Sequence, residues 1–204
     1  MKENAPKVRV IRRRGLKLSV GSLVLLLFCT FLIVTATFLQ LNITSITFSG
    51  EAYSFKFIPQ VPVVLFVAGF LGRKYGLAGV VLYILAGLFA APVFALGGGW
   101  QYVFEYGFGY ILAYVPAVFF AGSILRSGYS VRNLLHAAIV GVLTIHIIGV
   151  FYMLFLASIK GEGWTFMSGW ISAQSGLKIV YDLIFSFFAL FFARYVRILL
   201  WFYI

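Results

Sequence analysis

Lys178 and Asp182 are the residues whose types and spacing most directly suggest chemistry. They lie four positions apart in an apolar run, so a helix would place them one turn apart on the same face. A carboxylate inside a membrane helix is costly and usually faces the protein interior with a partner. Two interpretations stay open. The pair neutralises itself, or it meets a polar ligand, because an ammonium holds a carboxylate and a carboxylate accepts N–H donors.

A second candidate site is the loop over residues 92–102, where Pro92 is followed closely by three consecutive glycines. Proline ends a helix, and glycine adopts backbone angles that other residues avoid. We expect this loop to fold over a cavity that binds a small molecule. The alternative for the loop is that it binds no ligand, and the alternative for its tryptophan is that it only lies at the membrane interface. The residues expected to line the site, including one at the start of the next span, are Gly98, Gly99, Trp100, Gln101, Tyr102 and Tyr110.

Motifs for catalysis are missing from the sequence. There is no Gly-x-Ser-x-Gly, no His-Glu-x-x-His and no P-loop, so we expect no enzyme, and an ATP-driven role would need separate ATPase subunits. His136 and His146 are too far apart for a close-set ligand pair and Cys29 is the single cysteine, so we expect neither a metal site nor a cofactor. Two other functions stay open for this chain. One is an intramembrane enzyme that uses Asp182 or Glu105, although the sequence offers no nucleophile–base pair for it, and the other is a membrane assembly protein.

The elements that must position these residues are membrane spans. The chain has 204 residues, of which 63% are hydrophobic and 10% charged, whereas soluble domains carry about 25% charged residues. Apolar runs reach the roughly 20 residues that a membrane helix needs. We predict an all-α membrane protein with a basic cytoplasmic segment (residues 1–16) and one transmembrane substrate-binding domain (residues 17–204). Six spans are expected, of which the second and third could pair as a bent hairpin: residues 17–40, 57–72, 75–91, 107–125, 132–159 and 176–201.

The distribution of charge predicts the orientation of these spans. The net charge is +11, and a basic cluster directly before the first span indicates a topology signal and an anchor to lipid headgroups. Nucleic acid is not an expected partner, because no basic domain could hold it. We predict that both termini are cytoplasmic, that the protein is a multi-pass protein of the cell inner (plasma) membrane, and that the connections over residues 41–56, 92–106 and 160–175 are outer loops. The later inner segments carry only basic charges: Arg73 and Lys74, Arg126 and Arg132, and Arg194 and Arg197.

The stretch from Pro62 to Gly122 resembles the BioY family, the biotin-binding S components of energy-coupling-factor (ECF) vitamin transporters. The resemblance is carried by an ordered series of short motifs, and Tyr181-Asp182-Leu183-Ile184 is similar to the Gly-Asp-Leu-Leu-Lys motif of that family. The lysine of that motif is Phe185 here, which leaves Lys178 as the nearest cation. The matching motifs are Val67 to Gly76, Leu82 to Gly87, Pro92 to Ala95 with the glycines that follow, and Phe108-Gly109-Tyr110.

The resemblance implies a six-helix S-component-like bundle that captures biotin from outside. Its expected partners are a transmembrane coupling subunit and two cytoplasmic ATPase subunits. Asp182 would accept an N–H of the ureido group of biotin, and Lys178 would hold the carboxylate at its other end. Two ligand-facing segments differ from the family pattern, those over residues 57–62 and 106–110, so an S component for another small vitamin, such as lipoate, is the alternative.

Overall fold

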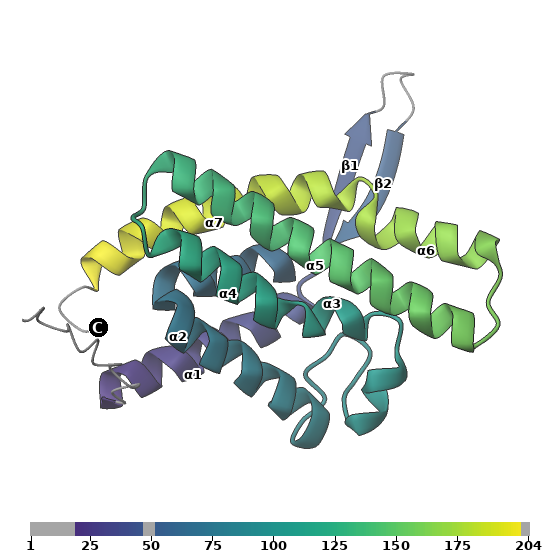
Figure 1. Ribbon diagram of the computed structural model, residues 1–204, viewed down its shortest axis with the longest axis horizontal. Coiled ribbons are helices and arrows are strands. Elements are labelled where there is room, and N and C mark those ends of the chain that lie inside the picture. Colours follow the sequence, from purple (N-terminus) through teal and green to yellow (C-terminus); the bar gives the residue numbers. More distant parts are fainter. Residues whose placement is uncertain (1–18, 47–51, 201–204) are drawn as a thin grey trace, which may run out of the picture.

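The computed structural model describes residues 19–46 and 52–200, and the predicted basic segment over residues 1–16 lies outside this part of the chain. Helices run side by side along one direction and form a bundle (Figure 1). Within the described residues, five helical stretches are long and apolar enough to cross a membrane. The helices are α1 (Val20–Phe38), α2 (Gln60–Phe89), the 3-10 helix η1 (Trp100–Phe104), α3 (Phe108–Leu112), α4 (Tyr114–Leu125), α5 (Val131–Ile159), α6 (Trp164–Ser175) and α7 (Lys178–Leu199).

Helix α2 folds back on itself at Gly72, which has a φ of 72° inside the helical stretch. The Gln60 side chain donates a 2.7 Å hydrogen bond to the Tyr83 hydroxyl, although a straight helix would separate these residues by roughly 35 Å at 1.5 Å per residue. The predicted spans over residues 57–72 and 75–91 are therefore the two arms, residues 60–71 and 73–89, of one helical hairpin. Each arm is shorter than the roughly 20 residues of an ordinary membrane helix.

The first arm of α2 forms the centre of the bundle. Most of its apolar side chains are buried, with Val63 and Phe66 partly exposed, and α2 packs against α1, α4 and α7. Close packing depends on small residues, as at other helix–helix contacts in membranes. A Cβ added at Gly69 would lie 2.9 Å from a methyl group of Leu190 and 3.1 Å from Ala193 on α7. The glycines of the sequence thus allow α7 to approach the core.

Two connections that the sequence analysis treated as loops contain regular structure. Residues 41–56 belong mostly to a β-hairpin in which β1 (Leu41–Ile46) pairs antiparallel with β2 (Ala52–Phe57), and this hairpin projects from the bundle (Figure 1). Residues 160–175 contain helix α6. The strands are too short to cross a membrane. Serine, glycine and glutamine interrupt the apolar pattern of α6, but the candidate membrane span Trp164–Leu199 includes this helix.

Candidate functional site

A cavity of about 420 Å³ lies where the start of α2, the loop over residues 92–99 and helices α3, α6 and α7 meet. Its size falls in the range of small-molecule sites, about 300–1,000 Å³. Aromatic and amide side chains line it beside a single cation, Lys178. The lining residues are Gln40, Ile58, Gln60, Val61, Ala95, Leu96, Tyr102, Gly107, Tyr110, Ile111, Tyr114, Trp170, Gln174 and Lys178.

Asp182 lies behind Lys178 with no exposed surface. Its Oδ2 accepts a 2.5 Å hydrogen bond from the Lys178 ammonium and lies 3.0 Å from the His146 Nε2. Its other oxygen, Oδ1, is buried without a hydrogen-bond partner in the described part of the chain. The predicted pairing of Lys178 with Asp182 is present, and one carboxylate oxygen is left over as an acceptor.

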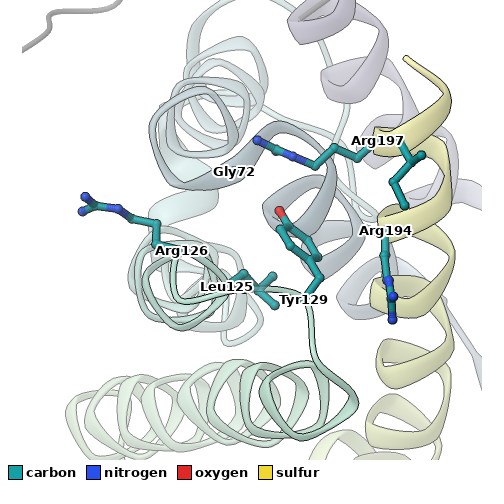
Figure 2. Close-up of a pocket in the computed structure, with 9 residues that line it drawn as sticks. Gly72, Leu125, Arg126, Tyr129, Arg194 and Arg197 are labelled. Atoms are coloured by element: carbon teal, nitrogen blue, oxygen red, sulfur yellow. The ribbon is translucent and has the colours of Figure 1, made fainter. Parts of the chain in front are cut away.

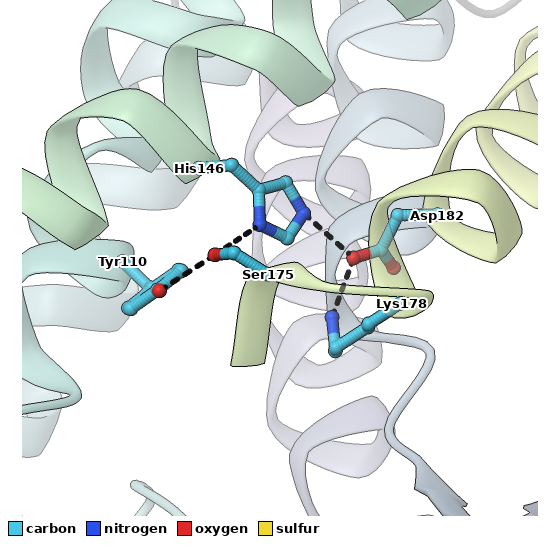
Figure 3. Close-up of polar contacts among 5 residues, drawn as sticks. All are labelled: Tyr110, His146, Ser175, Lys178 and Asp182. Carbon is cyan, nitrogen blue, oxygen red and sulfur yellow. Dashed lines mark hydrogen bonds and ion pairs between the residues drawn. The ribbon is translucent and has the colours of Figure 1, made fainter. Parts of the chain in front are cut away.

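The contacts of Asp182 continue into a hydrogen-bonded chain that reaches the cavity wall (Figure 3). The His146 Nδ1 lies 2.8 Å from the Ser175 hydroxyl, which lies 2.7 Å from the hydroxyl of Tyr110. A carboxylate only accepts, so the Nε2 of His146 carries the proton that faces Asp182. The Ser175 hydroxyl, placed between the His146 Nδ1 and the Tyr110 hydroxyl, then connects the ring to the cavity wall.

The chain of contacts exists because four helices meet at this point. His146 lies on α5, Ser175 ends α6, and Asp182 lies in the second turn of α7. Gly176 separates α6 from α7 with a ψ of −116°, so the chain leaves α6 directly after Ser175. On the other side, a Cβ added at Gly149 of α5 would lie 2.5 Å from the ring of Tyr110. That glycine therefore lets Tyr110 of α3 pack directly against α5.

A serine, a histidine and an aspartate linked in this order also occur in hydrolases. Two features of this site favour a structural role. Lys178 already shares the Asp182 oxygen that binds His146, which neutralises the carboxylate that would otherwise stabilise an imidazolium. Ser175 is buried and does not line the cavity, so its hydroxyl is not presented to a substrate. The series of hydrogen bonds from Tyr110 through Ser175 and His146 therefore holds Asp182 in place.

Three of the residues predicted from the sequence line the cavity: Tyr102, Tyr110 and Lys178. Tyr102 packs against Phe94 with ring centroids 4.6 Å apart, and burial raises the pKa of its phenol, which stays a hydrogen-bond donor at neutral pH. Trp100, 62% exposed, and Gln101, also exposed, do not line the cavity.

Gly98 and Gly99 hold the loop against α2 and do not line the cavity. A Cβ at Gly98 would lie 2.7 Å from the carbonyl oxygen of Gly87. The Gly99 amide donates a 2.8 Å hydrogen bond to the same carbonyl, and its φ of 94° is a conformation that favours glycine. The loop instead contributes Ala95 and Leu96 to the cavity.

Sequence reasoning missed several polar residues of the site. His146 was considered only as a metal ligand with His136, which lies exposed on α5. Gln60 lines the cavity and bridges the Thr37 and Tyr83 hydroxyls at 2.7 Å each. Trp170 also lines the cavity, and its indole N–H is buried without a partner among the described residues. Only the alternation of buried and exposed positions along α5 could have separated His146 from His136.

Comparisons with known proteins agree on one family. The model of the BioY family matches residues 9–200. The chain is 33% identical over 104 residues to the probable biotin transporter BioY of Lysinibacillus sphaericus, which covers 47% of this chain and 53% of that protein. It is 33% identical over 100 residues to the biotin transporter BioY of Thermotoga maritima, which covers 48% and 59%. The matched region thus spans little more than half the length of these relatives.

A solved structure shares the fold. The crystal structure of the S-component for biotin from an ECF-type ABC transporter matches with a TM-score of 0.67 and 23% identity, over 87% of this chain and 91% of that one. The family match extends over nearly the whole sequence, and the long apolar helices are those of a multi-pass membrane protein. The chain belongs to the BioY family.

Proposed function

We propose that the chain is the membrane-embedded substrate-binding subunit, the S component, of a vitamin uptake transporter, and that its ligand is biotin. Family membership supports this proposal, as do the two relatives named as biotin transporters. The observation that carries it is the pair of a fully buried Asp182 and a partly buried Lys178 beside a cavity of about 420 Å³. That pair offers a donor and an acceptor side by side, as a ureido group does.

The contact between Lys178 and Asp182 changes the roles expected from the sequence. The carboxylate and the ureido group of biotin are separated by a ring and a chain of four CH₂ groups, whereas the two side chains are 2.5 Å apart. They therefore act on one end of the ligand. The Lys178 ammonium donates to the ureido carbonyl, and the unpartnered Oδ1 of Asp182 accepts a ureido N–H. The indole N–H of Trp170, which has no partner among the described residues, is left to donate to the carboxylate.

The orientation and the partners belong to the same proposal. The two arms of α2 count as separate crossings, which gives six spans with both termini in the cytoplasm. The turns at Gly72 and between α4 and α5 lie with the end of α7 at one end of the bundle (Figure 1), and these segments carry only basic charges. Biotin then enters from outside, and import uses an ECF transmembrane coupling subunit and two cytoplasmic ATPase subunits in the plasma membrane.

Ligand titration of the purified protein tests the proposal. A screen of biotin, lipoate, thiamine and riboflavin identifies the vitamin, and lipoate is the sharpest comparison, because it has the same five-carbon acid as biotin but no ureido group. We expect tight binding of biotin alone. Asp182→Asn should raise the dissociation constant of biotin roughly tenfold to a hundredfold, since a hydrogen bond to a charged group contributes about 1.5–3 kcal/mol.

The matched control is Glu162→Gln, which makes the same change from carboxylate to amide at a residue that accepts a hydrogen bond from Tyr106 and does not line the cavity. Its affinity for biotin should equal that of the parent protein. Equal binding of lipoate and biotin would contradict the assignment of the ureido group. Unchanged biotin affinity in folded, monodisperse Asp182→Asn would leave the ion pair with a structural role alone.

A further inference from the structure

A second cavity, of about 460 Å³, lies at the opposite end of the bundle from the candidate substrate site. It is enclosed by the turn of α2 at Gly72, the end of α4, the α4–α5 turn and the last turns of α7. Figure 2 shows Tyr129 in its middle, with Arg126 from the end of α4 and Arg194 and Arg197 from α7 around it. Neither the proposed capture of biotin nor the chain through His146 uses this cavity.

Three arginines line this cavity, Arg126, Arg194 and Arg197, and they have no counter-ion in the described part of the chain. Both ion pairs found there belong to Asp182, at the other end of the molecule. Glu105 and Glu162, the other described acids, flank the loop and helix that cover the substrate cavity. Within residues 19–46 and 52–200, the positive charge of the second cavity is therefore not compensated, and such a charge attracts an anion.

Arg197 is held in place at this cavity. Its guanidinium donates a 2.8 Å hydrogen bond to the Phe70 carbonyl and lies 5.6 Å from the centre of the Tyr129 ring. Tyr129 is itself fixed by a 2.7 Å hydrogen bond from its hydroxyl to the Gly69 carbonyl. A guanidinium has five N–H donors, so most of those on Arg197 are left for a ligand.

Arg126 and Arg194 stand at the two sides of the cavity and extend away from its middle (Figure 2). Arg126 is exposed, and Arg194 is half-buried with its guanidinium 5.8 Å from the centre of the Tyr195 ring. Neither side chain has a described hydrogen bond to the backbone, so both are free to change rotamer. Both can therefore turn toward an anion held by Arg197. Arginine suits such a site because its planar fork matches two oxygens of one phosphate.

The rest of the wall is apolar or lacks side chains, with Leu125, Ile198 and three glycines. The cavity also lies at the ends of helices that are long and apolar enough to cross a membrane, where the lipid headgroups of a surrounding bilayer are expected. We propose that this pocket binds the phosphate of an anionic phospholipid, with the arginines on the phosphate and the apolar wall against the glycerol and first acyl carbons. Basic pockets between the ends of membrane helices bind such headgroups. A soluble phosphate or an acidic protein segment would leave the apolar wall without a partner.

Native mass spectrometry of the full chain, released from detergent micelles, tests the proposal. Titration with phosphatidylglycerol should give one saturable adduct, and zwitterionic phosphatidylcholine should give none at the same concentrations. Arg194→Gln should raise the apparent dissociation constant of phosphatidylglycerol about fivefold. Each arginine near anionic headgroups strengthens binding by about that factor, so the loss of one should weaken it equally. Arg126→Gln should have a similar effect, and neither variant removes a described contact with the backbone.

The matched control is Arg132→Gln, which removes one charge from the same end at an exposed position outside the cavity. Its affinity for phosphatidylglycerol should stay within about twofold of the parent. Equal weakening in Arg132→Gln would overturn the proposal in favour of diffuse surface charge. Saturable binding of inorganic phosphate or of a poly-glutamate peptide, with no lipid adduct, would overturn it in favour of a soluble anion or an acidic partner.

Discussion

The two cavities at the ends of the bundle are similar in size but differ in whether their charged side chains are paired with an opposite charge. At the substrate end, Asp182 has no exposed surface and shares one oxygen between Lys178 and His146. At the basic end, arginines line a cavity of about 460 Å³ without a carboxylate. The physical reason is burial. A fully buried charge must be paired within the fold, because desolvation costs several kcal/mol. The arginines of the basic end are exposed or half-buried, so their guanidinium groups stay hydrated until an anion binds.

The largest expected effect concerns which end faces the cytoplasm, because it is all or none. In a Cys29-free background, a single cysteine at Ser127, in the turn between α4 and α5, should stay unlabelled when intact cells meet an impermeant thiol reagent. The reason is the excess of basic residues at that end. A single cysteine at Gly161, in the α5–α6 turn at the other end, is the matched control and should label. Labelling at Ser127 with none at Gly161 would show that the two ends are exchanged.

The next largest effect is expected for Lys178→Met, which leaves Asp182 without its cation. Breaking a buried pair by removing one partner lowers the free energy of unfolding by about 3–5 kcal/mol. Cys29 provides the measurement, because it is the single cysteine and fully buried. A thiol-reactive fluorophore reports its exposure during heating. Lys56→Met, at an exposed lysine near the same end, should change the stability by less than about 0.5 kcal/mol.

A smaller effect is expected for His146→Phe, which removes the link between Ser175 and Asp182. The buried serine and carboxylate each lose one partner, so we expect a loss of about 1–3 kcal/mol in the free energy of unfolding. His136→Phe makes the same change at an exposed position of α5 and should stay within about 0.5 kcal/mol of the parent. If the two variants unfold at the same temperature, the series of hydrogen bonds that links Tyr110 to Asp182 does not stabilise the site.

The smallest effect is expected at the basic end. Arg126→Gln removes a charge with no described partner from an exposed position, so the unfolding of lipid-free protein in detergent should change by less than about 0.5 kcal/mol. Glu162→Gln removes a negative charge at the substrate end, and its free energy of unfolding is compared with that of Arg126→Gln. A loss above 1 kcal/mol in Arg126→Gln would mean that an internal contact, and not an external anion, sets the arrangement of that cavity.

The sequence by itself determined the class of the protein and the local part of its site. Composition and apolar runs predicted the membrane helices, and an ordered series of motifs identified the family. The contact of Lys178 with Asp182 could be predicted because residues four apart share one face of a helix. The fold-back of α2 was foreseen only as an alternative, because a glycine permits a reversal without requiring it.

The tertiary structure alone decided which distant residues complete the site. His146 lies 36 positions before Asp182 and Ser175 lies 29 positions after His146. Helical periodicity says nothing about such pairs, because their contact depends on how α5 packs against α6 and α7. In the same way, Gly98, Gly99, Trp100 and Gln101 looked like ligand contacts by composition, yet the cavity is lined by Ala95 and Leu96. The path of the loop was set by the hydrogen bond that the Gly99 backbone N–H donates to the Gly87 carbonyl on α2, a contact between segments that no local pattern encodes.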